Sequence, residues 1–304
     1  MSASISELRR LRVSGGELAF VEMGDPEDPA VLLLHGFPGS SYVWRQFAPL
    51  LSPWMHVIAP DLLGCGDSEQ PVDADLSVLA QVGYARELLV RLGIERLAVV
   101  GHAHGGGVAQ LLALDGGVET MILLDSIAFD AWPSETFGEL QRSAPEAPNA
   151  SLVRAVIATG FDLGMGHRPR LTDADLDEYC RPFSGGDGPA AFMRFARAID
   201  GEGLAGSEPS LRALEVPTLL LWGEDDPFMP VTVAERLADA LPMSSLAVLP
   251  GCSHFLMEDA PETIAPLMFE YLRAVYLRAG HVHEEPGPIT IELGRRPPGE
   301  EVGG

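Results

Sequence analysis

The stretch VVGHAHGGG, residues 99–107, decides the fold of this 304-residue chain. It begins as an apolar run typical of a buried strand, turns between glycines and continues into VAQLLAL, which is typical of a helix. Small residues stand on both sides of position 103 because larger side chains would collide with their neighbours in so sharp a turn. The pattern predicts a tight strand-to-helix turn that presents residue 103, where this chain has Ala103.

Around this turn, short runs rich in Leu, Val and Ile alternate with helical patterns, such as the one between Ser77 and Arg91. Runs that are apolar on both faces predict buried, mostly parallel strands. We therefore expect an α/β fold with a doubly wound, mostly parallel sheet of eight strands. The eight runs are LRRLRV, ELAFVEM, AVLLLHG, HVIAPD, RLAVVG, TMILLDS, PTLLLWG and SLAVLPG.

The alternation stops between about residues 131 and 212, where the sequence predicts helices and loops. A helical insertion of this kind, placed before the seventh strand, predicts a lid over the strand ends, where open α/β sheets bind ligands. Residues 1–130 and 213–280 are then the two parts of the core. Residues 281–304 form a tail, in which the run ITIEL indicates an extra edge strand, a contact in a homodimer or a loose segment.

The chain is strongly acidic. Twenty basic residues, all of them Arg, stand against 44 acidic ones, which gives a formal net charge of −24. Such a surface repels nucleic acid and anionic lipid, so we expect neither nucleic acid nor a membrane as partner. It also disfavours polyanionic substrates, and we expect a neutral or hydrophobic small molecule. Without Lys, Schiff-base chemistry through a lysine is excluded.

Targeting, redox and metal signals are weak. The N-terminal run MSASISELRRLRVSGGE lacks the apolar core of a secretion signal, and no apolar run approaches the roughly 20 residues that cross a bilayer. The sequence predicts a soluble, cytoplasmic protein in which Cys65, Cys180 and Cys252 stay reduced. His102 and His104, two residues apart, supply too few ligands for a metal. We expect neither a metal nor a cofactor.

Two further motifs stand in the chain order that a nucleophile, an acid and a base require. GEDDP, residues 223–227, follows a predicted strand and supplies an acid, and GCSHF, residues 251–255, supplies a histidine in a later loop. Upstream, LHGFP, residues 34–38, closes the third predicted strand. It is expected to place the backbone N–H of Phe37 opposite that of His104, so that the two form an oxyanion hole.

Five motifs in register resemble the α/β-hydrolase superfamily, in the branch that holds haloalkane dehalogenases, epoxide hydrolases and small esterases. The resemblance covers about residues 10–280. It implies the α/β-hydrolase fold with a nucleophile elbow, in which Ala103 stands where relatives carry the attacking residue. The motifs are HGFPGSSYVWRQF, PDLLGCGDSEQP, GHAHGG, LLWGEDDPFMP and PGCSHFLMEDAPE.

The same resemblance assigns the remaining catalytic roles. It makes His254 the general base or acid and Asp226 the carboxylate that orients it. Glu224 and Asp225 are interpreted as strand-end or solvent-facing neighbours, with either kept as an alternative acid. Asp125, at the end of the run TMILLDS, occupies the acid position that some relatives use instead.

Other residues are expected to contact the substrate or support the site. His102 is expected to pack beneath the turn, and His104 is left open between substrate contact and packing. His35 is interpreted chiefly as a residue that fixes the oxyanion loop by hydrogen bonding. The aromatic residues of the lid either line the pocket or join the lid to the core. The expected substrate contacts are His35, Trp44, Asp125, Tyr179 and Phe255.

Two departures from the family pattern bear on the substrate. Relatives that cleave carbon–halogen bonds usually have a halide-binding Asn and Trp at the positions that Phe37 and His104 occupy here. Epoxide hydrolases of this branch usually protonate the leaving alkoxide with two lid tyrosines, whereas the lid here contains only Tyr179. Dehalogenation is therefore disfavoured and epoxide opening is weakened.

Ala103 leaves three interpretations. In the leading one, the hydrolase has Ser or Asp at this position, acts on a small hydrophobic ester, lactone or epoxide, and is strongly impaired by Ala103. In the second, Ala103 is native, and the pair of His254 and Asp226 serves as a general base in a lyase, a cyclase or a cofactor-free oxygenase. In the third, the chain is a ligand-binding homologue without turnover.

Overall fold

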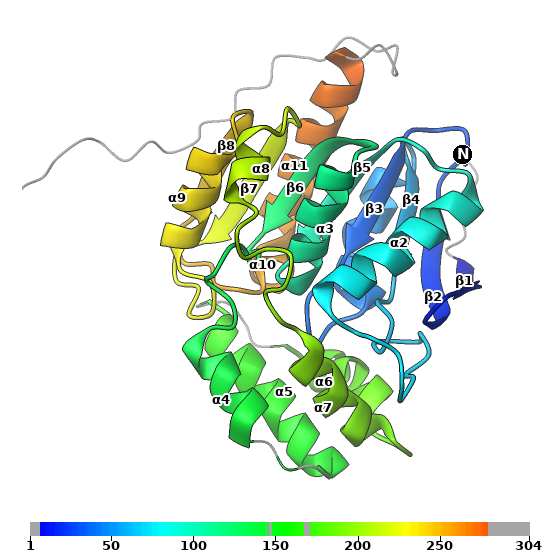
Figure 1. The fold of residues 1–304 in the computed structure, drawn as a ribbon, viewed down its shortest axis with the longest axis vertical. Coiled ribbons are helices and arrows are strands. Elements are labelled where there is room, and N and C mark those ends of the chain that lie inside the picture. The colour runs from blue at the N-terminus through cyan, green and yellow to red at the C-terminus, as the bar shows by residue number, and fades with distance from the viewer. Residues whose placement is uncertain (1–6, 144, 146–147, 167–170, 279–304) are drawn as a thin grey trace, which may run out of the picture.

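Eight strands form one sheet in the computed structural model, which describes residues 7–143, 145, 148–166 and 171–278 (Figure 1). Their order across the sheet is β1-β2-β4-β3-β5-β6-β7-β8, and only the pairs β1–β2 and β2–β4 are antiparallel. The predicted eight-stranded, mostly parallel sheet is thereby confirmed. The strands are β1 (Glu7–Val13), β2 (Gly16–Met23), β3 (Ala30–Leu34), β4 (His56–Pro60), β5 (Leu97–His102), β6 (Val118–Leu124), β7 (Thr218–Gly223) and β8 (Ser244–Leu249).

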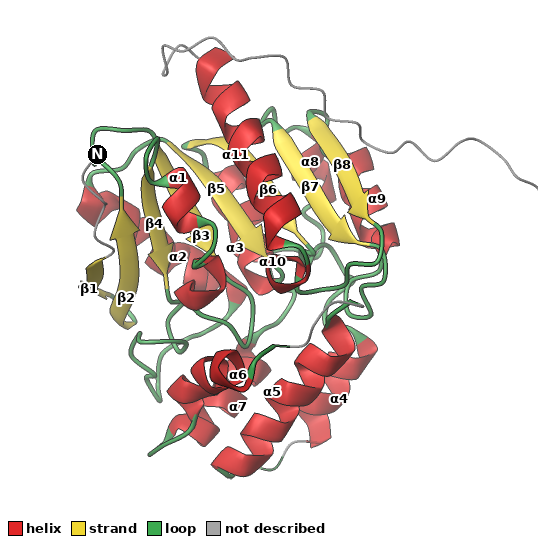
Figure 2. Ribbon diagram, turned by 180° about the vertical axis from the view of Figure 1, so that it is seen from behind, coloured by secondary structure: helices red, strands yellow, loops and turns green. Residues whose placement is uncertain are grey.

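Helices cover both faces of this sheet, as in a doubly wound fold. Figure 1 shows α2, α3 and α9 on one face, and Figure 2, seen from behind, shows α1, α10 and α11 on the other. α2 is well terminated, since Ser77 caps its first turn and Gly93, in the left-handed conformation, ends it. These helices are α1 (Ala48–Leu51), α2 (Val78–Leu92), α3 (His104–Asp115), α9 (Val231–Ala240), α10 (Leu256–Asp259) and α11 (Pro261–Arg278).

Strands β3 to β7 are buried and mostly apolar because each face of the sheet has its own core layer there. Successive side chains of a strand point to opposite faces. In β3, Leu32 and Leu34 join the layer beneath α2 and α3, whereas Val31 and Leu33 join the layer beneath α11. All four side chains are fully buried. The near-continuous apolar runs of the sequence therefore follow from a sheet that is covered on both sides.

A block of helices, which we call the helical segment, separates β6 from β7. Figures 1 and 2 agree that α4 to α7 lie beyond the carboxyl ends of the parallel strands. The N-termini of two of these helices are capped, α5 by the side chain of Asn149 and α6 by a capping box of Thr172 and Asp175. The members are α4 (Glu135–Ser143), α5 (Ala150–Gly164), α6 (Asp173–Cys180), η2 (Arg181–Phe183) and α7 (Gly188–Ala198). The short helix α8 (Glu208–Arg212) follows them and lies beside α9 (Figure 1).

One polar cluster joins the helical segment to the core. The hydroxyl of Tyr179 in α6 donates to Glu258 at 2.5 Å, and the guanidinium of Arg45 pairs with the same carboxylate at 2.6 and 2.8 Å. Tyr42, in the short helix η1 (Ser41–Trp44), donates to Asp175 at 2.7 Å. Burial and the neighbouring Glu258 raise the pKa of Tyr179 well above its ordinary value. The cluster therefore holds α6 against the carboxyl end of the sheet.

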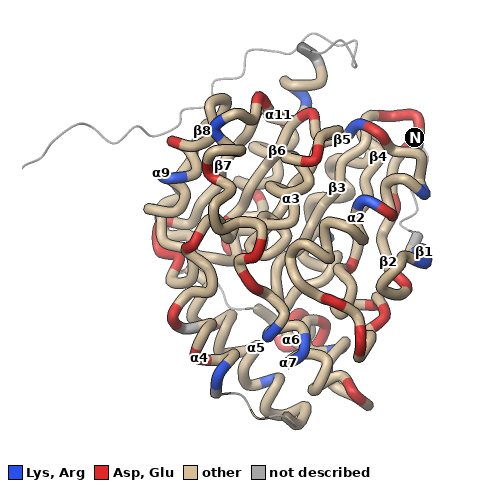
Figure 3. Tube along the Cα trace, viewed as in Figure 1, with Lys and Arg blue, Asp and Glu red and all other residues tan. Residues whose placement is uncertain are grey.

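Acidic residues are spread over the whole molecule, on the core as well as on the helical segment (Figure 3). Basic residues are fewer, and many of them form ion pairs with acidic neighbours, as Arg181 does with Asp67 and Arg236 with Glu208. Within the described residues, no helix is long and apolar enough to span a membrane. The strand-like run ITIEL of the tail lies outside the described residues.

Candidate active site

The predicted turn at residue 103 joins β5 to α3 in a rare backbone conformation. Ala103 has φ 47° and ψ −114°, which is strained for a residue other than glycine. Its N–H donates to the carbonyl of Leu124 at 3.0 Å, and its own carbonyl accepts from Gly106 and Ile127. Because hydrogen bonds on both sides fix the backbone, the turn holds residue 103 at the carboxyl edge of the sheet.

Glycine is required at two positions around this turn because backbone segments approach each other closely. A Cβ on Gly105 would lie 2.5 Å from the carbonyl oxygen of His35, and a Cβ on Gly101 would lie 2.6 Å from the Cα of Gly106. Neither backbone atom can move aside in the way a flexible side chain can. Gly101 and Gly105 therefore serve the packing of α3 against β3 and β5.

His254 and Asp226 form a hydrogen-bonded pair next to the turn. The Nδ1–H of His254 donates to Oδ2 of Asp226 at 2.8 Å, and Oδ1 of Asp226 accepts the backbone N–H groups of Phe228 and Met229 at 2.7 and 2.9 Å. In the tautomer that carries its proton on Nδ1, Nε2 of the ring is an acceptor. Glu224 and Asp225 are exposed, so Asp226 is the acid of the GEDDP motif that meets the histidine.

His102 and Asp259 hold the loop that carries His254. Nε2–H of His102 donates to the carbonyl of His254 at 3.0 Å, and Asp259 accepts the backbone N–H of Ser253 at 2.7 Å. Burial, together with the nearby His254 ring, lowers the pKa of His102 well below its ordinary value, so its ring is neutral. His102 thus packs beneath the turn, as expected, and ties the histidine loop to β5.

His35 shapes the loop after β3. Its Nδ1–H donates to the carbonyl of Gly36 at 2.8 Å, and its Nε2 accepts the N–H of Leu62 at 2.9 Å. This loop carries Phe37 past the turn, since a Cβ on Gly36 would lie 2.9 Å from that of Ala103. Phe37 and Ala103 accordingly line the same cavity.

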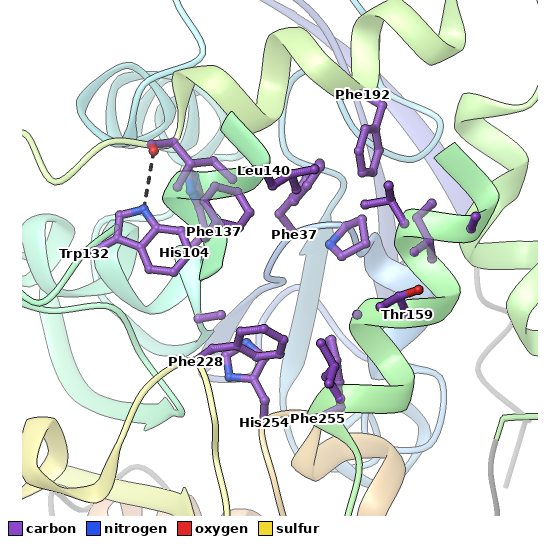
Figure 4. A pocket seen from close by; sticks show the side chains of 18 residues that line it. Phe37, His104, Trp132, Phe137, Leu140, Thr159, Phe192, Phe228, His254 and Phe255 are labelled. Carbon is purple, nitrogen blue, oxygen red and sulfur yellow. Dashed lines mark hydrogen bonds between the residues drawn. The ribbon is translucent and has the colours of Figure 1, made fainter. Parts of the chain in front are cut away.

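That cavity, of about 370 Å³, lies between the carboxyl edge of the sheet and the helical segment and is within the size range of small-molecule sites. Figure 4 shows His254 beside Phe228 and Phe255, with Trp132 and Phe137 along another part of the wall. Among the described residues, no Asp, Glu or Arg lines it. The walls come from Phe37, Pro38, Ala103, His104, Trp132, Phe137, Leu140, Ala155, Val156, Ile157, Thr159, Gly160, Leu163, Phe192, Ile199, Phe228, His254 and Phe255.

Four of the five expected substrate contacts lie outside this wall. Trp44 is fully buried against Phe47 in the core layer on the other face of the sheet, because its helix packs beneath the strands. The hydroxyl of Tyr179 is turned to Glu258. His35 is buried beneath its loop, and its ring nitrogens are engaged there.

Asp125, the fourth, is fully buried behind Asp226 and accepts the N–H of Gly223 at 2.8 Å. Burial and the adjacent Asp226 raise the pKa of Asp125 well above its ordinary value. It therefore stands next to the acid that meets His254 and does not replace it. Of the five expected contacts, only Phe255 lines the cavity.

Sequence reasoning missed much of the wall. Phe228 follows Asp226 by two residues in the motif LLWGEDDPFMP. Its closeness to the acid could have predicted that its ring lies beside that of His254. In α5, Val156, Gly160 and Leu163 share one helix face and all line the cavity. Which face of α5 is turned to the cavity depends on how the helical segment packs, and no periodicity reveals that.

The comparisons with known proteins agree with this fold. The model of the alpha/beta hydrolase family matches residues 31–267. A haloalkane dehalogenase of Bradyrhizobium diazoefficiens is 28% identical over 288 residues, covering 85% of this chain and 91% of that protein. An α/β hydrolase fold protein from Burkholderia ambifaria superposes with a TM-score of 0.79 at 28% identity, covering 88% and 100% of the two chains.

A third similar protein, described as a membrane phospholipase A and bacterial virulence factor, has a TM-score of 0.75 at 30% identity, with 89% of this chain and 86% of the other covered. The fold, the strand-to-helix turn and the His254–Asp226 pair define an α/β hydrolase. The chain belongs to the α/β hydrolase family, since the family model spans most of its length. Haloalkane dehalogenases are among its homologues.

Proposed function

We propose that the cavity takes a small, mostly hydrophobic ester, lactone or epoxide, and that position 103 is the nucleophile position of a hydrolase. With Ala103, the chain binds such a molecule without attacking it. The observation that carries the proposal is the strained backbone of Ala103, whose side chain lines the cavity together with that of His254. Such strain is explained if the turn serves to present a side chain, and Ala presents no reactive atom.

The surrounding groups fit each step of hydrolysis through a nucleophile at 103. A serine hydroxyl there would transfer its proton to Nε2 of His254 while its oxygen attacks the substrate carbonyl. The carbonyl oxygen, now negatively charged, would accept the backbone N–H groups of Phe37 and His104, and the latter also begins α3, whose dipole favours negative charge. The intermediate would then collapse to an acyl-enzyme as the alkoxide leaves with the proton from Nε2 of His254. Water activated by His254 would hydrolyse the acyl-enzyme, releasing the acid and restoring the serine.

An aspartate at 103 would support a different reaction. Its carboxylate would displace a leaving group from carbon or open an epoxide, forming an alkyl ester on the protein, and water activated by His254 would hydrolyse that ester. The relatives named haloalkane dehalogenase support this version. Phe37 and His104, at the positions of the halide ligands in the family pattern, weigh against a halide-binding site.

An ester or lactone is the substrate class that the cavity favours. Epoxide opening in the related branch uses lid tyrosines, but among the described residues no tyrosine lines the cavity, and Tyr179 is hydrogen-bonded to Glu258. The walls are apolar, which favours uncharged substrates. An ester carbonyl needs only a nucleophile, His254 and two backbone N–H groups.

The test compares the chain with Ala103→Ser and Ala103→Asp on a panel of activated esters, lactones and epoxides. We expect Ala103→Ser to gain ester turnover and an acyl adduct visible by mass spectrometry. An alkyl ester on Ala103→Asp would instead indicate an epoxide hydrolase or a dehalogenase. If neither variant turns over a compound that the Ala103 chain binds, the nucleophile assignment is wrong.

A second function is favoured by one observation. The His254–Asp226 pair is complete, although the neighbouring Ala103 has no nucleophilic atom. In that version, His254 acts directly as a general base on a substrate proton or on water, without a covalent intermediate. The Ala103 chain itself would then be active, and His254→Ala would abolish the activity. Binding without turnover in the chain and in both variants would favour a ligand-binding homologue.

A further inference from the structure

His104 differs from the other buried histidines of this site in its hydrogen bonding. The residue is 2% exposed and lines the cavity, yet neither Nδ1 nor Nε2 has a hydrogen-bond partner among the residues that the structure describes. Its ring contacts that of Phe195 in α7, at 5.4 Å between ring centroids. His35 and His102 are equally buried, but both nitrogens of His35 and Nε2 of His102 are hydrogen-bonded.

Leaving these nitrogens without partners destabilises the folded chain. An unsatisfied buried donor or acceptor costs on the order of 1–3 kcal/mol, and a phenylalanine would fill a similar space without that cost. A buried imidazole without partners is therefore unexplained by folding alone. It is explained if the partner is a molecule that enters the cavity.

We infer that His104 recognises an uncharged hydroxyl or carbonyl oxygen of the ligand, in addition to the group that reacts at position 103. The inference rests on the proposed ligand pocket, and it adds a second polar point to its substrate. The imidazole is well suited to this task, because its neutral form offers one donor and one acceptor, as a hydroxyl does. The rest of the ligand lies against aromatic walls such as Phe37 and Phe192.

The surroundings of His104 require this oxygen to be uncharged. Burial, with a smaller contribution from His35, lowers the pKa of His104 to about 3, so the ring carries no charge to pair with an anion. Among the described residues, the cavity wall also has no Arg that could neutralise a carboxylate. A phenolic or alcoholic hydroxyl or a ketone therefore fits, whereas a carboxylate does not.

The first test needs no ligand. His104→Phe should raise the melting temperature of the ligand-free protein by roughly 2 °C, because it removes unsatisfied polar atoms. The matched control is His35→Phe, which should lower it, because both nitrogens of His35 are hydrogen-bonded within the protein. A clear loss of stability in His104→Phe would overturn the inference, since the ring nitrogens would then have partners in the folded chain.

The second test measures binding by calorimetry with two probes of similar shape, 2-naphthol and 2-methylnaphthalene. The Ala103 chain should bind 2-naphthol roughly fivefold to tenfold more tightly, as expected for one hydrogen bond. His104→Phe should remove this preference and keep the affinity for 2-methylnaphthalene. His104→Gln, which again offers a donor and an acceptor, should restore the preference.

The outcomes separate the inference from the proposed function. If both probes bind and the preference is the same in the chain and in His104→Phe, His104 does not recognise the oxygen, although the pocket is a hydrophobic ligand site. If neither probe binds, the proposed pocket function is contradicted, and the inference that rests on it is overturned as well. A preference for 2-naphthoate over 2-naphthol would also overturn it, because an anion needs a charge that His104 lacks.

Discussion

Nδ1 of His254 lies 2.8 Å from Oδ2 of Asp226, and this hydrogen bond joins two loops that are 28 residues apart in the chain. The carboxylate is itself held by two backbone N–H groups, those of Phe228 and Met229. The bond therefore fixes both the orientation and the tautomer of the imidazole, leaving Nε2 as the acceptor. An imidazole fixed in this way is prepared to take a proton.

If Ala103→Ser gives an active enzyme, its turnover should depend on this pair. We expect His254→Ala in that background to lower kcat by several orders of magnitude, and Asp226→Asn to lower it by roughly 10⁴-fold through the wrong tautomer. Steady-state kinetics on one activated ester measures both. Glu224→Gln, at an exposed neighbour of Asp226, serves as the control and should leave kcat unchanged. Near-full turnover in His254→Ala would contradict the assignment.

The glycine framework of the turn gives a stability prediction. Gly105→Ala should destabilise the chain strongly or prevent folding, because its Cβ would overlap the backbone carbonyl of His35 at 2.5 Å. Gly83→Ala in α2 is the matched control. Apart from the backbone of its own helix, no atom of the described residues lies within 4 Å of its Cβ position, and we expect a gain of roughly 0.5–1 kcal/mol. Thermal melting compares the two, and equal stability would contradict the close approach.

The buried neutral imidazole of His104 gives a pH dependence. Its pKa falls from the ordinary 6.5 to about 3 in the folded chain, so below pH 6.5 the unfolded chain binds a proton that the folded chain does not. The free energy of unfolding therefore falls with decreasing pH between about 6.5 and 3, at most by about 1.4 kcal/mol per pH unit from this group. His104→Phe should remove that contribution.

Urea unfolding at pH 7 and pH 5 measures this difference. Asp125 acts in the opposite direction. Burial raises its pKa, so the free energy of unfolding falls as the pH rises above the ordinary pKa of an aspartate. This effect is the same in the unmodified chain and in His104→Phe. Phe192→Leu, which changes the cavity wall without a titratable group, should keep the pH dependence of the chain. An unchanged slope in His104→Phe would show that its imidazole is not held neutral.

Limited proteolysis tests the predicted lid. We expect the first cuts within residues 131–212 or in the tail beyond His281, because loops that connect a lid open more readily than a core sheet. Tyr179→Phe removes the hydrogen bond to Glu258 and should speed cleavage in the helical segment. Tyr84→Phe, whose hydroxyl bonds to Asp75 within the core, is the control. Preferential cleavage inside the sheet would count against a mobile lid.

The sequence by itself determined the sheet and the chain order of the site. Apolar runs indicated the inner strands β3 to β7, because a sheet that is buried on both faces needs hydrophobic residues at consecutive positions, and such runs are visible without any partner. The glycines around Ala103 predicted the turn, because glycine is required there by the local crowding of backbone atoms. The pairing of His254 with a carboxylate of the GEDDP motif followed from the order of the motifs together with their resemblance to the α/β-hydrolase superfamily.

Only the tertiary structure decided which residues face the cavity. Trp44 and Tyr179 are aromatic and stand in or beside the family motifs, yet one packs on the far side of the sheet and the other turns its hydroxyl to Glu258. The direction of a side chain depends on how separate helices pack, which no local pattern encodes. The sequence also could not show that the ring nitrogens of His104 lack hydrogen-bond partners, because this depends on all the residues that pack around the ring.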